Sequence, residues 1–449
     1  MGFGLAALYF VFLFSATVFE LYLWKREKIS AYSIFNATFT LYYILTPLIL
    51  NLFKGFLSHQ SGRFISYIYS SSTAELYGAY FISVVSYAVI VAIYFLGKSF
   101  KRQQKLKVEH SQQVEKKSMR SIMRVGMFLF FIGSLSILIF FNELGGFGAA
   151  LRFSNSLRGL GSKPEDFYGP MGALFRMLSF FILGSSYCIK VYSDNDKKLR
   201  YKILFYSSFT LSIMYLLFNA GRATIIFFLI PFVLEYIRKK KKNILATLLF
   251  IFVGTIFIAN IFDIFLYRLS TGNIQLDLDN VDLIDNIIAV IQDLSFPYSN
   301  IILSSKMNEM FGFRFGQDYF IWIFDILPSR IFNIIGITIP DFESINNNTS
   351  LFYYIMNPSR GGVPTDFITL GMRQLHVSGV IFNSFLFSIF ALYIDGLSKK
   401  VHEKYYLIIT RVDLLFFTVI ANNDITSIVR SSLFIIILII ALIRVKRIK

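Results

Sequence analysis

The chain has 449 residues, of which 55% are hydrophobic and only 16% are charged, and its mean hydropathy is +0.60. This composition excludes a set of ordinary soluble domains and indicates a membrane protein. The net charge is +17 and Cys188 is the single cysteine, which excludes an internal disulfide and cysteine-based zinc sites. A charge of this size indicates a nucleic-acid partner only if it gathers on one soluble face, so its position along the chain has to be considered first.

Apolar runs of membrane-spanning length recur from one end of the chain to the other. A helix that crosses the hydrocarbon core needs about 20 predominantly apolar residues. The sequence predicts about eleven such helices, with ten and twelve as bounds, at residues 2–23, 31–53, 76–97, 122–143, 171–192, 203–219, 223–237, 243–266, 377–397, 405–421 and 425–443. The predicted fold class is therefore an all-α polytopic membrane protein, in which residues 1–449 form a single integral membrane domain.

The basic residues cluster in the loops between these runs. Of the 44 Lys and Arg residues, 28 lie in six clusters, the largest within residues 98–124. All six clusters fall on one side of the membrane if the chain alternates through the eleven helices, as the positive-inside rule requires of cytoplasmic loops. Residues 98–121 are thus predicted to form a basic cytoplasmic loop, with the N-terminus outside. Because the clusters lack the interleaved aromatic residues of a binding groove, nucleic acid is excluded as a partner.

Residues 267–376 form a segment of about 110 residues that this topology places on the outer, periplasmic side, longer than a connecting loop needs to be. The helical spacing of Ile287, Ile291 and Leu294 predicts amphipathic helices that lie on the membrane surface or pack over the helix bundle. The apolar run 319–335 is interrupted by charges and a proline, which predicts a re-entrant or interfacial element.

Arginines on the outer side are not explained by topology. The planar guanidinium stays charged at physiological pH and matches phosphate oxygens in pairs, so converging arginines indicate an anionic lipid headgroup such as a diphosphate. For any single arginine, a solvated surface is the alternative. The outer candidates are Arg222, Arg268, Arg314, Arg330, Arg360 and Arg373. Arg411 and Arg430 lie within predicted helices, with Asp413 as the expected ion-pair partner of Arg411.

A glycine-rich turn precedes the helix predicted at 377–397. Gly361 and Gly362 lie between Arg360 and Asp366, and paired glycines let a backbone approach a ligand closely. Arg360 supplies a cation and Asp366 a proton acceptor, so both are candidate catalytic residues. A purely structural turn is the alternative interpretation.

His376 follows Arg373 by three residues. On a helix this spacing puts the two side chains on one face, about 5 to 6 Å apart at Cβ. Arg373 would then contact phosphate while His376, largely neutral near pH 7, takes a proton from an acceptor hydroxyl. A packed interfacial histidine is the alternative.

Short motifs occur in a fixed order between residues 200 and 400. Ala220-Gly221-Arg222-Ala223 opens a predicted helix, Arg314-Phe315-Gly316 precedes Leu327-Pro328-Ser329-Arg330, and Gly361-Gly362-Val363-Pro364-Thr365 precedes a helix that carries Gly379. Together with the many helices and one dominant outer segment, this order resembles the Wzy-type O-antigen and oligosaccharide repeat-unit polymerases of bacterial inner membranes. The chain departs from that family at Leu370, where members often have an acidic residue, and at His376, where they often have glycine.

The resemblance implies a GT-C-like membrane fold and a metal-independent glycosyltransferase without a cofactor. It implies transfer of a growing glycan from undecaprenyl diphosphate to a sugar hydroxyl of the next lipid-linked repeat unit, on the periplasmic side of the bacterial inner membrane. The expected catalytic residues are His376, Asp366 and Arg360, and the expected diphosphate ligands are Arg222, Arg314, Arg330 and Arg373. The expected partners are undecaprenyl-diphosphate-linked oligosaccharides and membrane lipids, with a chain-length regulator as a further candidate.

Two other classes of protein stay open at this point. A Wzx-type flippase of lipid-linked oligosaccharides has similar length and hydrophobicity, but the long outer segment argues against it. An O-antigen ligase differs in its acceptor, the lipid A core, which no residue here reveals. The sequence has no Gly-x-x-x-x-Gly-Lys-Ser/Thr loop, which fits a reaction whose leaving group is already a lipid diphosphate.

Overall fold

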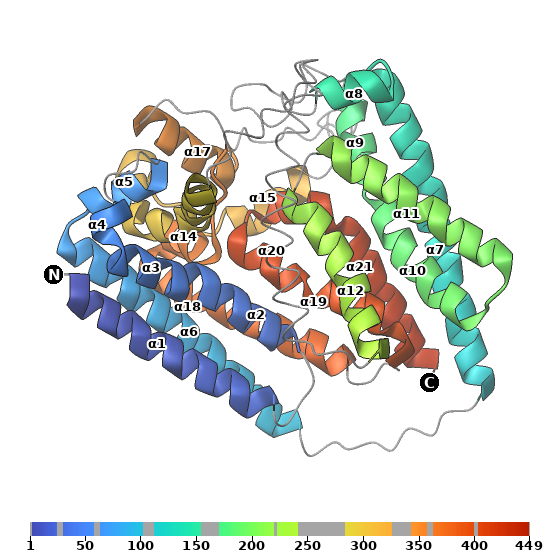
Figure 1. The fold of residues 1–449 in the computed structure, drawn as a ribbon, viewed down its shortest axis with the longest axis horizontal. Helices are drawn as coiled ribbons and strands as arrows, with labels where there is room; N and C mark the ends of the chain where they lie inside the picture. Colours follow the sequence, from blue (N-terminus) through green and yellow to red (C-terminus); the bar gives the residue numbers. More distant parts are fainter. Residues whose placement is uncertain are drawn as a thin grey trace.

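The computed structural model describes residues 2–24, 30–57, 63–101, 112–153, 170–219, 222–240, 283–325, 343–356, 362–398 and 403–448. Every regular element within these ranges is a helix (Figure 1). The first half of the chain contains α1 (Gly2–Trp24), α2 (Ala31–Phe39), the π-helical turn η1 (Thr40–Leu45), α3 (Thr46–Leu52), α4 (Lys54–Leu57), α5 (Arg63–Ser70), α6 (Thr73–Lys101), α7 (Gln112–Glu143), α8 (Phe147–Phe153), α9 (Pro170–Ser179), α10 (Phe181–Asn195), α11 (Leu199–Asn219) and α12 (Arg222–Lys240). The second half contains α14 (Leu283–Phe311), α15 (Asp318–Asp325), α17 (Ile345–Met356), α18 (Phe367–Ser398), the short η5 (Glu403–Tyr405), α19 (Tyr406–Asp413), α20 (Leu415–Ala421) and α21 (Ile425–Ile448).

Eight spans in the described part of the chain are long and apolar enough to cross a membrane, which identifies a multi-pass membrane protein. They are Phe3–Leu23, Ala31–Leu52, Thr73–Ser99, Lys117–Glu143, Leu174–Asn195, Leu199–Phe218, Phe367–Ser398 and Ile425–Val445. Each coincides with a predicted apolar run, so eight of the eleven predicted helices are confirmed.

The remaining three predicted spans behave differently. Residues 223–237 lie in α12, which contains Pro231 and is not among the eight. Residues 405–421 are divided at Leu414 into α19 and α20, each too short to span a bilayer alone. Residues 243–266 lie outside the described residues. Of the predicted basic loop 98–121, its first residues belong to α6 and residues 112–121 to α7, so both ends of this region are helical.

The helices form two groups joined by a third. In Figure 1 the first helices, α1, α2 and α6, lie beside α14 and α18 at one side of the molecule, whereas α7, α10 and α11 lie at the other. Between them stand α12, α19, α20 and α21. Within the second group, Gly126 and Gly133 of α7 face α10 so closely that an added Cβ at Gly133 would lie 2.5 Å from the backbone nitrogen of Ile182. Small residues thus let these helices approach closely, as is common in membranes.

α14 belongs to the core and not to the membrane surface. Residues 295–304 are buried without interruption, and the helix packs against α5, α6 and α18. The hydroxyls of Ser295 and Ser304 donate hydrogen bonds to carbonyls of their own helix. The Ser299 hydroxyl accepts a hydrogen bond from the Tyr353 hydroxyl at 2.8 Å. Since serine satisfies its polar group locally, these positions pack as small residues. α14 therefore lies within the bundle, whereas the sequence predicted amphipathic helices on the membrane surface or over the bundle.

α18 begins with a hairpin. Leu375 (φ −146°, ψ 32°) and His376 (φ 57°, ψ −140°) are not helical, and they separate a short helix, residues 367–374, from a long one, residues 377–398. A Cβ added to Gly371 would lie 2.6 Å from the Cα of Val380, and the Asn383 side chain donates to the carbonyl of Phe367 at 2.8 Å. The short helix, called here the half-helix, therefore runs antiparallel to the start of the long one.

The hairpin places its turn at one end of a membrane-length helix. Residues 377–398 span about 33 Å at 1.5 Å per residue, close to the thickness of the hydrocarbon core. The turn at Leu375 and His376 therefore lies at the end of this helix opposite to Ser398. The sequence-based topology, which puts the Lys399–Lys400 cluster on the cytoplasmic side, predicts that this turn lies on the outer side.

Candidate functional site

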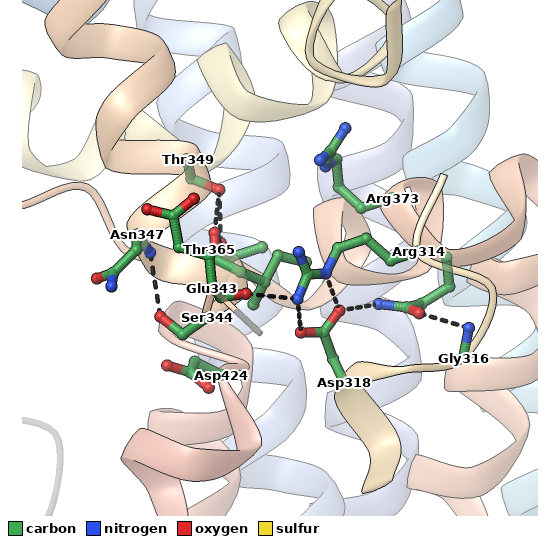
Figure 2. Close-up of polar contacts among 12 residues, drawn as sticks. Arg314, Gly316, Asp318, Glu343, Ser344, Asn347, Thr349, Thr365, Arg373 and Asp424 are labelled. Carbon is green, nitrogen blue, oxygen red and sulfur yellow. Dashed lines mark hydrogen bonds and ion pairs between the residues drawn. The ribbon is translucent and has the colours of Figure 1, made fainter. Parts of the chain in front are cut away.

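A buried polar cluster surrounds the end of the half-helix (Figure 2). Its centre is Arg314, whose Nη2 and Nε both donate to the carboxylate of Asp318, the former at 2.8 Å. Nη2 also donates to the carbonyl of Glu343 at 2.7 Å. With the Asn348 amide turned so that its oxygen faces Arg314, that oxygen accepts from Nη1 at 2.8 Å. Four of the five N–H groups of this guanidinium are thus used inside the protein.

Arg314 is therefore a weak candidate for binding a diphosphate. Its side chain is buried and its charge is neutralised by Asp318 at bidentate distance. A guanidinium held in this way is a structural link between the segment that follows α14 and the start of α17. The predicted diphosphate role of Arg314 stays a prediction, and the geometry favours a structural one.

Arg373 lies in the same cluster but, unlike Arg314, has no carboxylate partner among the described residues. Its side chain is only 1% exposed, its Nη1 donates to Asn308 Oδ1 at 2.7 Å, and its guanidinium lies 5.8 Å from the ring centre of Phe311. Nη2 has no hydrogen-bond partner, and no carboxylate of the described residues lies within ion-pair distance of it. A buried donor without an acceptor costs about 1–3 kcal/mol, and more when it is charged, so an anion at Nη2 would be strongly stabilised.

Backbone contacts hold the end of the half-helix in place. The amides of Arg314 and Phe315 donate to the carbonyls of Arg373 and Gln374, at 3.0 and 3.3 Å. The Gln374 side chain accepts from the amide of Gly316 at 2.7 Å and donates to Asp318. The carbonyls that a helix leaves unpaired at its C-terminus are thus satisfied by the 314–316 segment. This arrangement fixes the backbone of Arg373 while its Nη2 keeps no partner.

Asp366 caps the other end of the half-helix. Its Oδ1 accepts from the amides of Ile368 and Thr369, both at 3.1 Å, and from the Tyr43 hydroxyl at 2.7 Å. Oδ2 accepts from the Asn300 amide at 3.1 Å. A fully buried carboxylate with four donors is typical of an N-cap, so the structure gives Asp366 a structural role next to the catalytic one predicted.

His376 does not share a helix face with Arg373, and that part of the prediction is wrong. The chain leaves the helical conformation at Leu375, so the i, i+3 geometry does not apply. Arg373 is buried, whereas His376 is exposed in the turn, with its ring 6.4 Å from that of Phe313. The physical reason is the close approach of Gly371 and Gly379, which requires the chain to reverse between them.

Of the remaining predicted residues, few are placed. Arg222 begins α12, but its side chain lies outside the described part of the structure. The whole residues Arg268, Arg330 and Arg360 lie outside it as well. The described residues thus bring Arg314, Arg373 and Asp366 to the half-helix and leave the other arginines unplaced. Arg411 and Asp413 make no ion pair with each other among the described residues. Residues two apart point to different sides of a helix, which explains why the two side chains do not meet. The guanidinium of Arg411 lies 5.2 Å from the ring centre of Phe434.

Several residues of the cluster have no counterpart among the predictions. They are Asn308, Asp318, Glu343, Asn348 and Gln374. Only Asp318 had a signal in the sequence, because it follows Arg314 by four residues, the spacing of many ion pairs. The others come from distant segments. In the described ranges no group of three or more His, Cys, Asp or Glu residues could hold a metal ion. No family model, no curated protein and no solved structure matches this chain.

Proposed function

We propose that this protein polymerises undecaprenyl-diphosphate-linked oligosaccharide repeat units on the periplasmic side of the bacterial inner membrane. The reaction is a glycosyl transfer from the lipid diphosphate to a sugar hydroxyl of the incoming unit. The product is O-antigen or a related surface polysaccharide. The many membrane-spanning helices and the motif order of residues 200–400 support this proposal, and a buried arginine supplies the chemistry.

The observation that carries the proposal is the unpartnered Nη2 of Arg373. When the bond to the anomeric carbon breaks, negative charge develops on the departing diphosphate. A fixed guanidinium in a water-poor site stabilises such charge without reorganising, and one preorganised donor is typically worth about 2.7–4 kcal/mol of barrier. Arg373 meets these conditions, because Asn308 orients it and no described carboxylate lies within ion-pair distance of it.

A lipid-oligosaccharide flippase is the second candidate, and one observation favours it. Arg411 is 5% exposed, and its Nε and Nη1 lack hydrogen-bond partners. Ionisable residues at membrane depth often mark a transport pathway. An O-antigen ligase would use the same anion chemistry as the polymerase, and only its acceptor would differ.

Deletion of the gene in its host, followed by gel analysis of surface polysaccharide, separates the three functions. Single-repeat products in place of a ladder indicate the polymerase. Retained lipid-linked polymer indicates a ligase, and repeat units that accumulate on the cytoplasmic side indicate a flippase. Complementation with Arg373→Ala tests the site, with Arg430→Ala as the control, since Arg430 is exposed on α21. The proposal predicts that Arg430→Ala restores the ladder and that Arg373→Ala does not.

A further inference from the structure

Among the described residues, four carboxylates lie at the half-helix or in the cluster at its end, and three of them are held by other groups. Asp318 is bound by Arg314 and Gln374, and Asp366 caps the half-helix. Asp424 caps α21, where its Oδ1 accepts from the amide of Thr426 at 3.1 Å and its Oδ2 from the Ser427 hydroxyl at 2.8 Å. All three are buried, so none of them is free to exchange a proton with a substrate hydroxyl.

Glu343, the fourth carboxylate, differs in each respect. It is exposed, and no Lys or Arg of the described residues lies within ion-pair distance of its carboxylate. Its position is nevertheless fixed, because its carbonyl accepts from Arg314 Nη2 at 2.7 Å. In the Asn348 orientation that satisfies Arg314, the Asn348 nitrogen donates to Glu343 Oε2 at 2.6 Å. Glu343 is thus a held, accessible and un-neutralised carboxylate.

Glu343 and Arg373 are linked through Arg314, whose Nη2 donates to the Glu343 carbonyl and whose amide donates to the Arg373 carbonyl. Figure 2 shows the carboxylate of Glu343 and the guanidinium of Arg373 both extending away from Asp318, with the Arg314 side chain between their bases. A carboxylate alone would not indicate a ligand. The buried and unpartnered Nη2 of Arg373 is the independent observation that does, because it calls for an anion in the same cluster.

We infer that Glu343 is the general base of the glycosyl transfer, an inference that rests on the proposed function. The carboxylate takes the proton of the acceptor hydroxyl while that oxygen bonds to the anomeric carbon of the donor sugar. The bond between this carbon and the diphosphate oxygen breaks, and its electron pair leaves with the diphosphate. Arg373 stabilises the negative charge of this leaving group. Glu343 then passes the proton to water. Asn348 is a positioning residue that holds Oε2 and leaves Oε1 for the hydroxyl.

The test uses the purified full-length protein, synthetic undecaprenyl-diphosphate-linked repeat units and single-turnover rates measured across pH. Loss of a general base typically costs about 10²–10⁴ in rate, so Glu343→Gln should be at least 100-fold slower, with little change in binding of the lipid-linked donor. Glu343→Asp should recover part of the rate. Glu309→Gln, which changes an exposed glutamate of α14, is the matched control.

The outcomes separate the two proposals. If the wild-type protein makes no polymer from these substrates, the proposed function fails and Glu343 loses its role with it. If the wild-type protein polymerises and Glu343→Gln turns over within twofold of it, the base assignment alone is overturned. Equal melting temperatures of Glu343→Gln and Glu309→Gln distinguish a chemical effect from a loss of folding.

Discussion

Arg314 and Arg373 are two buried arginines of one cluster, and they differ in how their charge is compensated. Arg314 has a bidentate carboxylate partner, a carbonyl and an amide oxygen. Arg373 has one amide oxygen and a nitrogen with no partner. Burial of a charge is expensive unless it is paired. We therefore interpret Arg314 as part of the scaffold and Arg373 as part of a site that a ligand completes.

The largest expected effect comes from breaking the compensated pair. Arg314→Ala leaves Asp318 buried without a cation, which typically costs about 3–5 kcal/mol. We expect a fall in the melting temperature of the detergent-solubilised protein and loss of polymer as a consequence of unfolding. Replacing both partners, as in Arg314→Met with Asp318→Leu, should be much less destabilising than Arg314→Ala. Equal melting temperatures of wild type and Arg314→Ala would contradict the scaffold role.

Arg373→Ala should remove activity with a smaller loss of stability than Arg314→Ala. We expect a drop of about 10²–10³ in the rate of chain extension, the usual effect of losing one preorganised donor. The melting temperature should fall less than in Arg314→Ala, because no buried carboxylate loses its cation, although Asn308 Oδ1 loses its donor. Arg373→Lys should restore the rate only in part, since a point charge replaces a planar fork. A variant that extends chains normally would remove Arg373 from the reaction.

A substitution at Gly371 should destabilise the hairpin that carries Arg373, because this glycine is in close contact with Val380. Gly371→Ala puts a Cβ 2.6 Å from the Val380 Cα, where only backbone movement relieves the clash, so we expect a cost of about 1–3 kcal/mol. Gly78→Ala in α6 is the matched control, because no atom lies within 4 Å of the added Cβ and alanine favours a helix. Melting curves of the two variants check the difference, and equal destabilisation would argue against the hairpin.

The smallest effect is expected at the turn. His376 has a φ of 57°, which costs a residue with a Cβ about 1–2 kcal/mol relative to glycine. His376→Gly should therefore raise stability by about that amount and keep activity if the ring plays no part in catalysis. His376→Gln keeps the strain and serves as its control. If both variants lose at least tenfold in rate with unchanged folding, His376 acts chemically and the backbone explanation is insufficient.

The sequence predicts the membrane spans well because apolar length is a local property. The runs at 76–97 and 425–443, for example, reappear as spans within α6 and α21. The hairpin is not predictable in the same way. Its turn carries His376 at a positive φ in place of the expected glycine. The predicted helix at 377–397 matches the long helix, but no separate helix was predicted for residues 367–374. The contact of Gly371 with Gly379 and Val380 and the hydrogen bond from Asn383 to the Phe367 carbonyl, which join residues far apart along the run, show that the chain reverses.

The site was predictable only in part, for a related reason. Arg314 and Arg373 stand out in the sequence as outer charges, and an ion pair with Asp318 is within reach of spacing arguments. What distinguishes the two arginines lies elsewhere in the chain. Asn348, in α17, saturates Arg314, and Asn308, 65 positions from Arg373, holds only one nitrogen of its guanidinium. Such partners follow from how α14, α17 and α18 pack, which no short motif encodes.

Binding of undecaprenyl diphosphate to the purified protein tests the central claim most directly, because it needs no acceptor and no turnover. A charge-assisted hydrogen bond is worth about 1.5–3 kcal/mol, so Arg373→Ala should bind this lipid at least tenfold more weakly than wild type in a titration followed by native mass spectrometry. Arg430→Ala should bind it like wild type. Equal affinity of Arg373→Ala and wild type would contradict the assignment of the unpartnered Nη2 to the diphosphate.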